Sequence, residues 1–207
     1  PSKLGRVPVL ALRGTDGQLR GLINVCRHRG GPLATVSGSG RILRCEYHGW
    51  SYKHSGELIG APKMEKNAAF DPTCYSLQHF SIREWRGLLF GCLSHNPPDF
   101  DAIMDGVIRP DCPADFSRLA FMNRIVYRVQ CNWKMYVDNY MEGYHVSMVH
   151  PELASALDIS NYVTEVSTHW SLQRSPLSDK PSSYSDSGGD AHYFFILPNI
   201  MFNIIPG

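Results

Sequence analysis

Apolar and polar residues alternate in short runs along the first half of the chain, a pattern that predicts β-strands. The runs 7–13 (VPVLALR) and 19–25 (LRGLINV) flank the turn sequence Gly-Thr-Asp-Gly at 14–17. Because Asp-Gly between two such runs favours a tight turn, the three segments predict a hairpin. Shorter strands, separated by Gly, Ser and Pro, are expected at 41–44, 51–53 and 88–93. This half is therefore predicted to be all-β.

The second half carries both strand and helix patterns, so the fold class expected for the whole chain is α+β. Residues 96–115 are acidic and include four prolines, which favours a connection between domains. A longer strand is expected at 121–130, and the apolar stretch 192–205 is expected to supply core strands. The Ser-, Asp- and Gly-rich stretch 175–190 is predicted to be a mobile surface insertion. The chain stops at Gly207 directly after predicted core strands, which suggests a fragment.

One helix is predicted between these strands. Asn132 is a suitable N-cap for a helix from Trp133 to about His150, and Pro151 is expected to mark its end. At about 100° per residue, one broad apolar face forms. It consists of Trp133, Tyr136, Val137, Tyr140 and Tyr144, and the opposite face holds Asp138, Glu142 and His145.

The composition suits a globular protein able to bury a sizeable core, with 207 residues, 43% hydrophobic and 19% charged. A net charge of +1 without a Lys or Arg cluster gives no sign of a nucleic-acid or membrane partner. No run of about 20 apolar residues is present, so no transmembrane helix is expected. Six cysteines, four of them scattered singly, are typical of a reducing compartment, and a cytoplasmic location is predicted.

Two mixed pairs of cysteine and histidine are the first candidate for chemistry. Cys26 and His28 form a Cys-x-His pair, and Cys45 and His48 form a Cys-x-x-His pair. A zinc site could use two Cys and two His, but zinc modules usually space each pair by two to four residues. Two facing loops could instead place both thiolates on one iron and both imidazoles on the other. That is the ligand set of a Rieske [2Fe–2S] centre, and the pattern favours it over zinc.

The second candidate lies in the predicted helix, where two histidines stand five residues apart. In a straight helix His150 would point about 140° away from His145, so both could bind one metal only if the helix distorts or ends between them. Two His and one carboxylate around an open-sided iron form the facial triad of non-haem Fe(II) oxygenases. A His-x4-His pair alone is a moderate indication of an iron site. Its occurrence in the same chain as the first motif strengthens that indication.

With both motifs in place, the chain resembles the catalytic α subunits of Rieske non-haem iron oxygenases along essentially its whole length. The resemblance implies an all-β Rieske [2Fe–2S] domain with linker at 1–112 and the beginning of a helix-grip catalytic domain at 113–207. It also implies roles for seven residues. Cys26, His28, Cys45 and His48 match the cluster ligands, His145 and His150 match the histidines of a mononuclear Fe(II), and Glu142 matches the acid that bridges the two centres.

The resemblance further implies partners for the chain. Electrons would come from a reductase or ferredoxin and pass from His48 of one subunit through Glu142 to His145 of the next, in a homotrimer. The iron would then activate O2 for hydroxylation or demethylation of a small organic substrate. The family's third iron ligand, an Asp or Glu, lies far downstream and is expected after residue 207. Acids that follow His150 in this chain include Asp158, Glu165, Asp186 and Asp190, and none of these four is expected to bind iron.

Several alternatives stay open at this level. A bridging glutamate resembles the branch that acts on quaternary ammonium compounds such as choline, betaine or carnitine, with aromatic-ring hydroxylation as the main rival. An aromatic cage of Tyr136, Tyr140 and Tyr144 would suit a cation, but their shared apolar face indicates core packing. A Rieske-type electron carrier would need only about the first hundred residues, and a zinc-stabilised binding module would leave the Cys-x-His spacing unexplained.

Overall fold

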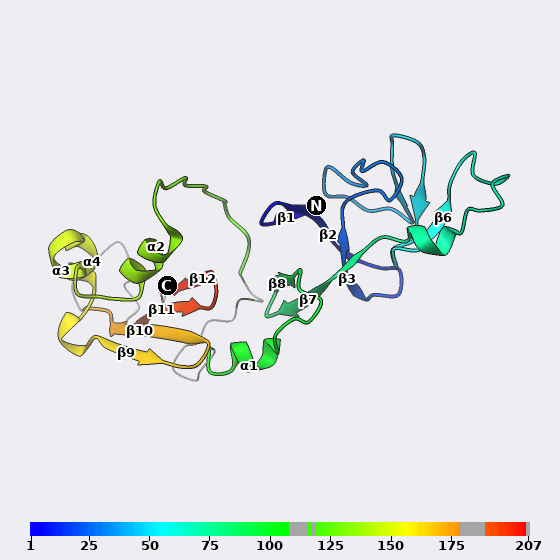
Figure 1. Cartoon of the computed structure of the whole chain (residues 1–207). Coiled ribbons are helices and arrows are strands. Elements are labelled where there is room, and N and C mark those ends of the chain that lie inside the picture. Colours follow the sequence, from blue (N-terminus) through cyan, green and yellow to red (C-terminus); the bar gives the residue numbers. More distant parts are fainter. Residues whose placement is uncertain (108–115, 117–118, 179–188, 206–207) are drawn as a thin grey trace. The chain divides into compact units, whose positions relative to one another are not determined.

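A computed structural model of the chain describes residues 1–107, 116, 119–178 and 189–205. These residues form two compact units, Pro1–Pro97 and Pro98–Gly207. Figure 1 shows strands throughout the first unit, whereas the second combines a sheet with short helices. The α+β fold class predicted from the sequence is confirmed. The predicted boundary at 112/113 lies outside the described residues.

The first unit is built on a five-stranded antiparallel sheet in the order β1-β2-β3-β7-β8. The predicted hairpin is confirmed, because β2 (Val7–Arg13) pairs with β3 (Leu19–Ile23) across the turn at 14–17. Gly17 takes the left-handed conformation that this turn needs, with φ of +76°. The remaining strands are β1 (Ser2–Leu4), β7 (His79–Trp85) and β8 (Leu88–Cys92).

A smaller three-stranded sheet in the same unit carries both mixed pairs on its flanking loops. It consists of β4 (Leu43–Arg44), β5 (Ser51–Tyr52) and β6 (Leu58–Gly60), and the 3-10 helix η1 (Pro72–Tyr75) follows it in the chain. One continuous core joins the two sheets, with Leu10 and Leu22 from the large sheet, Tyr52 and Leu58 from the small one, and Trp50 from the loop before β5. The core also includes Cys26 and Cys45, so both candidate ligand thiols belong to the packed interior.

The second unit contains a four-stranded antiparallel sheet in the order β12-β11-β10-β9. Its strands are β9 (Val163–Val166), β10 (Trp170–Pro176), β11 (Asp190–Ile196) and β12 (Ile200–Ile204). The last two confirm the strands expected at 192–205. Helical segments are α1 (Phe100–Met104), α2 (Trp133–Tyr140), α3 (Val146–Val149), α4 (Pro151–Ala156) and the 3-10 helix η3 (Ile159–Asn161).

Two predictions for this unit are wrong, one in part and one entirely. The helix expected from Trp133 to His150 does begin after Asn132, whose side chain accepts from the Lys134 N–H, but α2 already ends at Tyr140. Pro151 begins α4 instead of ending a helix, because the missing N–H of a proline costs nothing in a first turn. Residues 121–130 form no strand, since no neighbouring strand supplies hydrogen bonds to them among the described residues.

The insertion predicted at 175–190 starts later than expected. Ser175 and Pro176 belong to β10 and pair with Ala191 and Asp190 of β11, and residues 179–188 lie outside the described residues. Helix α1 lies within the connection expected at 96–115. None of the described helices has the length and apolar character needed to cross a membrane.

Candidate functional site

Two loops of the first unit, the first loop at 26–31 and the second loop at 45–50, share one backbone design. In each, the cysteine N–H donates to the carbonyl five residues on, from Cys26 to Gly31 at 2.8 Å and from Cys45 to Trp50 at 2.9 Å. In each, the residue four places after the cysteine is a glycine that donates back to the cysteine carbonyl. Gly30 and Gly49 fill this place with φ of +76° and +77°. The two loops thus hold their candidate ligands on backbones with the same hydrogen bonds and the same glycine turn.

The four candidate ligands divide into a buried pair and an exposed pair. Cys26 and Cys45 are each only 3% exposed, whereas His28 and His48 are exposed. The two imidazole rings lie together, with centroids 4.5 Å apart. A Cβ on Gly31 would lie 2.9 Å from the Cys45 sulfur, so the space beside this thiol exists only because residue 31 is glycine. The structure therefore brings all four residues together, with sulfur inside and nitrogen outside.

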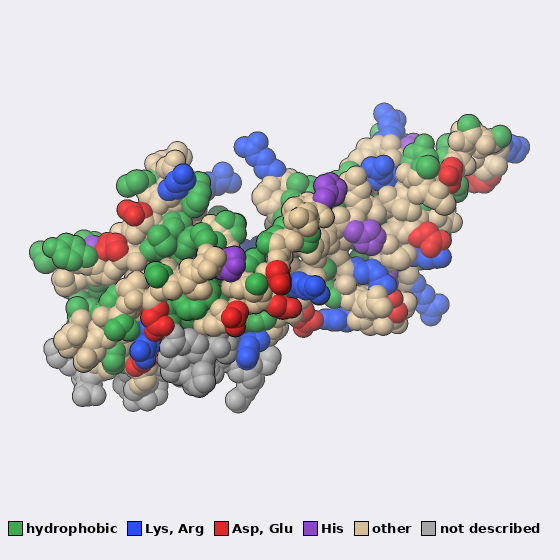
Figure 2. All heavy atoms as spheres, turned by 60° about the horizontal axis from the view of Figure 1, so that its bottom comes forward, with side chains coloured by type: hydrophobic (Ala, Val, Ile, Leu, Met, Phe, Trp, Pro, Cys, Tyr) green, Lys and Arg blue, Asp and Glu red, His purple; other side chains and the backbone are tan. Residues whose placement is uncertain are grey.

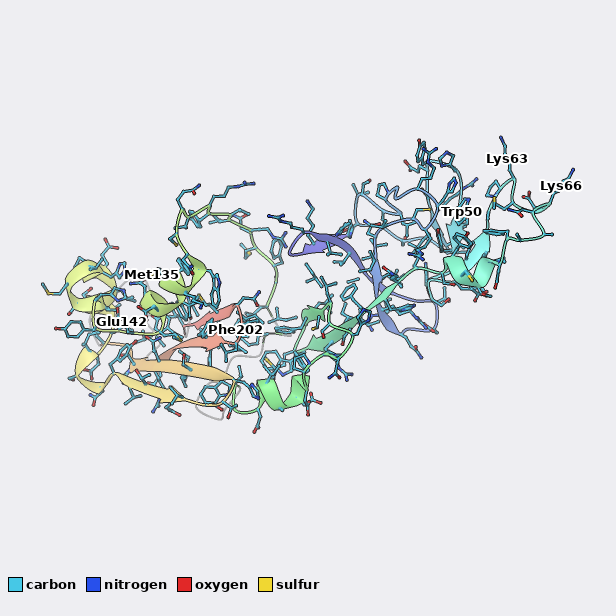
Figure 3. All side chains as sticks on the ribbon, viewed as in Figure 1. Trp50, Lys63, Lys66, Met135, Glu142 and Phe202 are labelled. Carbon is cyan, nitrogen blue, oxygen red and sulfur yellow. The ribbon has the colours of Figure 1, made fainter. Side chains whose placement is uncertain are left out.

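Aromatic residues pack around this site in two different ways. Trp50 is buried, stacks on the His28 ring at 4.8 Å and meets Phe70 and Tyr75 edge to face, so it belongs to the core as well as to the site. Tyr47 stays exposed beside His48. Figure 3 places Trp50 in the packed part of the unit, while Lys63 and Lys66 extend from the loop after β6.

Two buried polar side chains that sequence reasoning missed support the first loop. Asn24 accepts from the Leu33 and Ala34 N–H groups at 2.9 and 3.2 Å and donates to the Ala34 carbonyl at 2.7 Å. The Tyr52 hydroxyl lies 3.2 Å from the Cys26 sulfur and accepts from the Arg27 N–H at 3.1 Å. The only sequence signal for these residues is their place at the end of a predicted strand, two residues before Cys26 and two after Trp50.

Electrostatics at the site follow from this burial. Desolvation, reinforced by the neighbouring Cys26 thiol, raises the pKa of Cys45. Desolvation also lowers the pKa of His48, with further contributions from His28, Arg29 and Lys63. The protein alone therefore favours neutral groups here, and a bound cation would be needed to stabilise the thiolates.

The arrangement of two buried thiols and two exposed imidazoles suits a two-iron cluster. No three of the His, Cys, Asp and Glu side chains within the described residues are grouped so as to hold one metal ion. A Cys2His2 zinc site needs all four side chains around one ion, whereas a Rieske cluster needs only two on each iron. Two pairs on two equivalent loops fit the cluster.

In the second unit, Glu142 lies just after α2 (Figure 3). It forms one hydrogen-bonded group with His145. One carboxylate oxygen of Glu142 bonds His145 Nδ1, and the other accepts from the N–H groups of Tyr144 and His145. Desolvation acts to raise the pKa of Glu142, but these hydrogen bonds outweigh it and lower that pKa below its ordinary value. Because the carboxylate engages Nδ1, the Nε2 atom of His145 is the one left for a metal.

His150 lies close to His145 because the helical segment is interrupted between α2 and α4. The rings of His145 and His150 lie 5.2 Å apart between centroids at an interplanar angle of 74°. Helix α3 spans only Val146–Val149, and His150 leaves helical geometry with φ −123° and ψ 69°. The condition set by the sequence, that the helix must end for the two rings to meet, is fulfilled. Both histidines line a cleft of about 200 Å³ together with Glu142.

Among the described residues, no acid joins the two histidines in a group that could hold a metal ion. Asp190 forms an ion pair with Arg174 at 2.8 Å, and Asp158 accepts hydrogen bonds from Ser160 and Asn161. Asp186 lies outside the described residues. The residues present therefore fit two protein ligands of a facial triad.

The apolar face predicted for the helix is only partly buried. Val137 and Tyr140 are half-buried, whereas Trp133, Tyr136 and Tyr144 are 58%, 56% and 93% exposed. Tyr144 is exposed because α2 ends before it. Further exposed apolar side chains come from 119–129, including Phe121, Met122 and Tyr127, and Figure 2 shows hydrophobic groups at the surface of this unit.

Comparison with known proteins agrees with this geometry. Residues 2–81 match the Rieske [2Fe-2S] domain, and residues 116–207 match the ring hydroxylating alpha subunit (catalytic domain). The chain is 34% identical over 206 residues to choline monooxygenase, chloroplastic, from Beta vulgaris, covering 95% of this chain and 46% of that protein. It is 31% identical to the carnitine monooxygenase oxygenase subunit of Acinetobacter baumannii, covering 96% of this chain and 56% of that protein. A solved quaternary ammonium Rieske monooxygenase superposes with a TM-score of 0.89 at 30% identity, covering 100% of this chain and 57% of that one.

A cluster-binding domain followed by an iron-binding catalytic domain defines an oxygenase component. The chain belongs to the α subunits of the Rieske non-haem iron oxygenases. This membership implies a [2Fe–2S] cluster and a mononuclear iron, and members of the family use O2 and a reductase or ferredoxin donor. The chain spans about half the length of the relatives it matches.

Proposed function

We propose that the whole protein is a Rieske monooxygenase whose cluster and iron are held by seven residues of this chain. Cys26, Cys45, His28 and His48 hold the cluster, His145 and His150 supply two ligands to the iron, and Glu142 links the two centres. The single observation that carries the proposal is the pair of equivalent loops, which join two buried thiols to two exposed imidazoles. We assign residues 1–112 to the cluster domain with its linker and 113–207 to the catalytic domain.

The bound metals would supply one-electron transfer and O2 activation, so that one oxygen atom enters the substrate and the other leaves as water with two electrons and two protons. The chain's own residues prepare this chemistry. Glu142 keeps the Nδ1 proton of His145 in place and thereby fixes the orientation of that ring. His28 and His48 stand at the protein surface, which allows electrons to enter and leave through the imidazole side.

The substrate we propose is a small quaternary ammonium compound, which the enzyme hydroxylates or demethylates. The names of the choline, carnitine and glycine betaine monooxygenase relatives support this class. Aromatic-ring hydroxylation is the second candidate, because residues 116–207 match a catalytic domain described as ring hydroxylating.

We further propose an electron donor, an oligomeric state and a cellular location for the protein. A reductase or ferredoxin delivers electrons, and a homotrimer lets the cluster of one subunit serve the iron of the next, as the inter-subunit electron transfer named for the solved neighbour suggests. None of the five described cysteines forms a disulfide, which supports a reducing, cytoplasmic location. Cell fractionation distinguishes this location from the chloroplast named for the Beta vulgaris relative.

Spectroscopy of the purified chain tests the cluster. We expect broad visible absorption in the oxidised protein and, after anaerobic reduction, the paramagnetic resonance of a mixed-valence iron pair. Metal analysis should give about two iron atoms per chain for the cluster alone. A colourless protein with stoichiometric zinc would refute the proposal.

Turnover of the full-length enzyme tests the second centre. His145→Ala should abolish product formation with reductase and substrate while leaving the cluster spectrum intact. His169→Ala, which removes a histidine outside the cleft, is the matched control and should keep turnover. Choline, carnitine and glycine betaine are compared with naphthalene as substrates; oxidation of naphthalene alone would move the assignment to the aromatic-ring branch.

A further inference from the structure

The buried side-chain amide of Gln173, on β10, bonds the last residue of α2 and so ties the end of that helix to the sheet. Gln173 is 2% exposed. Its Nε2 donates to the Tyr140 carbonyl at 2.6 Å, and its Oε1 accepts from the Tyr162 hydroxyl. Both ends of the amide are therefore used, as a buried polar group requires. Neither Gln173 nor Tyr162 belongs to either of the two motifs found in the sequence.

Gln173 replaces a hydrogen bond that the helix gives up. If α2 continued, the Tyr140 carbonyl would accept from the N–H of Tyr144, four residues on. In the structure the Tyr144 N–H instead bonds the Glu142 carboxylate. Gln173 satisfies the carbonyl left over, so the helix can stop at Tyr140 without an unpaired buried acceptor. Stopping there is what frees Glu142 to bond His145.

The ring of Tyr162 restricts the backbone at Gly143 by steric contact. A Cβ on Gly143 would lie 2.4 Å from Cζ and 2.7 Å from Cε1 of the Tyr162 ring, so the ring lies directly on the Gly143 backbone. Gly143 does not have a positive φ, and the demand for glycine is therefore one of space. Because Gly143 follows Glu142 and precedes the Tyr144–His145 pair, the ring limits where these residues can go.

The same helix end is anchored a second time through the side chain of Tyr140. Its hydroxyl donates to Asn203 Oδ1 at 2.6 Å, on β12. The backbone and the side chain of Tyr140 are thus both tied to the sheet, on β10 and β12. Residues Met141 to His145 therefore continue from a fixed point at the end of α2.

We propose that Gln173 and Tyr162 are positioning residues for the Glu142–His145 pair. They end α2 at Tyr140, confine the Gly143 backbone and so place the His145 ring where it meets His150. Both line the cleft that holds His145 and His150, and both act through the backbone between α2 and α3. This inference rests on the proposed function of His145 and His150 as iron ligands.

The test uses the full-length enzyme with Tyr162→Phe, which removes only the hydroxyl, and Gln173→Met, which keeps the length of the side chain without its hydrogen bonds. Fe(II) affinity of the second site is measured anaerobically by titration, with the paramagnetic resonance of the ferrous nitrosyl adduct as the readout. We expect Fe(II) binding about tenfold weaker in each variant, as for other outer-shell partners of metal ligands. The cluster spectrum should not change.

A matched control is Tyr136→Phe, which removes a hydroxyl from an exposed tyrosine of α2 and should bind Fe(II) as the wild type does. Gly143→Ala should weaken Fe(II) binding at least as much as Tyr162→Phe. Combined with Tyr162→Ala, which removes the ring, it should cost less than the sum of the two single effects, because both changes act on one contact. If Gln173→Met does not fold, Tyr162→Phe and the comparison of Gly143→Ala, Tyr162→Ala and the double variant still test the positioning role.

The outcomes separate this inference from the proposed function. If the wild-type enzyme shows a cluster but binds no second iron, the proposed function fails. If the wild type binds it and Tyr162→Phe and Gln173→Met bind it equally well, only the positioning role is refuted. A lower melting temperature without any change in Fe(II) affinity would likewise refute it, since that pattern marks a structural role.

Discussion

The hydroxyl of Tyr52 lies 3.2 Å from the sulfur of Cys26, in the interior of the first unit. Desolvation, followed by the neighbouring Cys26 sulfur, raises the pKa of Tyr52 well above its ordinary value. The hydroxyl therefore stays protonated and can donate to a thiolate on an iron. This contact ties the potential of the cluster to a residue that is not one of its ligands.

Tyr52→Phe is expected to lower the reduction potential of the cluster. A donated hydrogen bond favours the more negative, reduced state, so its loss disfavours reduction. A hydrogen bond to a charged group is worth roughly 1.5 kcal/mol, and about 1.4 kcal/mol corresponds to about 59 mV for one electron, so the shift should be about 20–60 mV. A redox titration followed by paramagnetic resonance measures it. Tyr75→Phe, in the same aromatic group beside Trp50, is the control, and an equal shift there would contradict the assignment.

Gly31→Ala is expected to reduce cluster content. The added methyl would lie 2.9 Å from the Cys45 sulfur, inside the loop frame, and overpacking of this kind costs roughly 1–3 kcal/mol. Visible absorbance per chain measures the effect. Gly38→Ala provides the control, because a Cβ there would meet nothing within 4 Å. Equal cluster content in both variants would show that Gly31 is not needed for space.

Asn24→Ala should destabilise the first unit. The change leaves the Leu33 and Ala34 N–H groups and the Ala34 carbonyl without their partner, and one buried unpaired group costs roughly 1–3 kcal/mol. We expect the free energy of unfolding to fall by about 2–4 kcal/mol, as measured by chemical denaturation. Asn67→Ala, which removes a hydrogen bond on an exposed loop, should cost far less. A similar loss in both variants would contradict the role of Asn24.

Asp158→Asn should change the acid dependence of the second unit. Hydrogen bonds from Ser160 and then Asn161 lower the pKa of the Asp158 carboxyl below 3.8, its ordinary value. A folded-state pKa below the unfolded one gives stability that is complete above the unfolded pKa and lost as pH falls through the folded pKa. The melting temperature of the variant should therefore lie below that of the wild type at pH 7. The difference should shrink below pH of about 4, and a constant difference would exclude this role.

Much of this protein follows from local pattern alone. The hairpin of β2 and β3 follows from two β-rich runs and one Asp-Gly turn, because turn chemistry acts within four residues. The two mixed Cys/His pairs indicate the cluster because ligand type and spacing limit which metals they can hold. A further signal was available in the repeated Cys-x-x-x-Gly, which predicts the positive φ shared by Gly30 and Gly49.

Tertiary structure decided where the helical segment stops. Periodicity continues through residues 133–150, yet α2 ends at Tyr140 because Gln173 and Tyr162, 33 and 22 positions along the chain, satisfy a carbonyl and occupy the space over Gly143. No local pattern contains partners so distant. Residues 121–130 show the reverse case, since strand-forming side chains form a strand only beside another strand. Sequence thus determined which atoms are available to bind metal, and only packing between distant segments decided how the protein holds them.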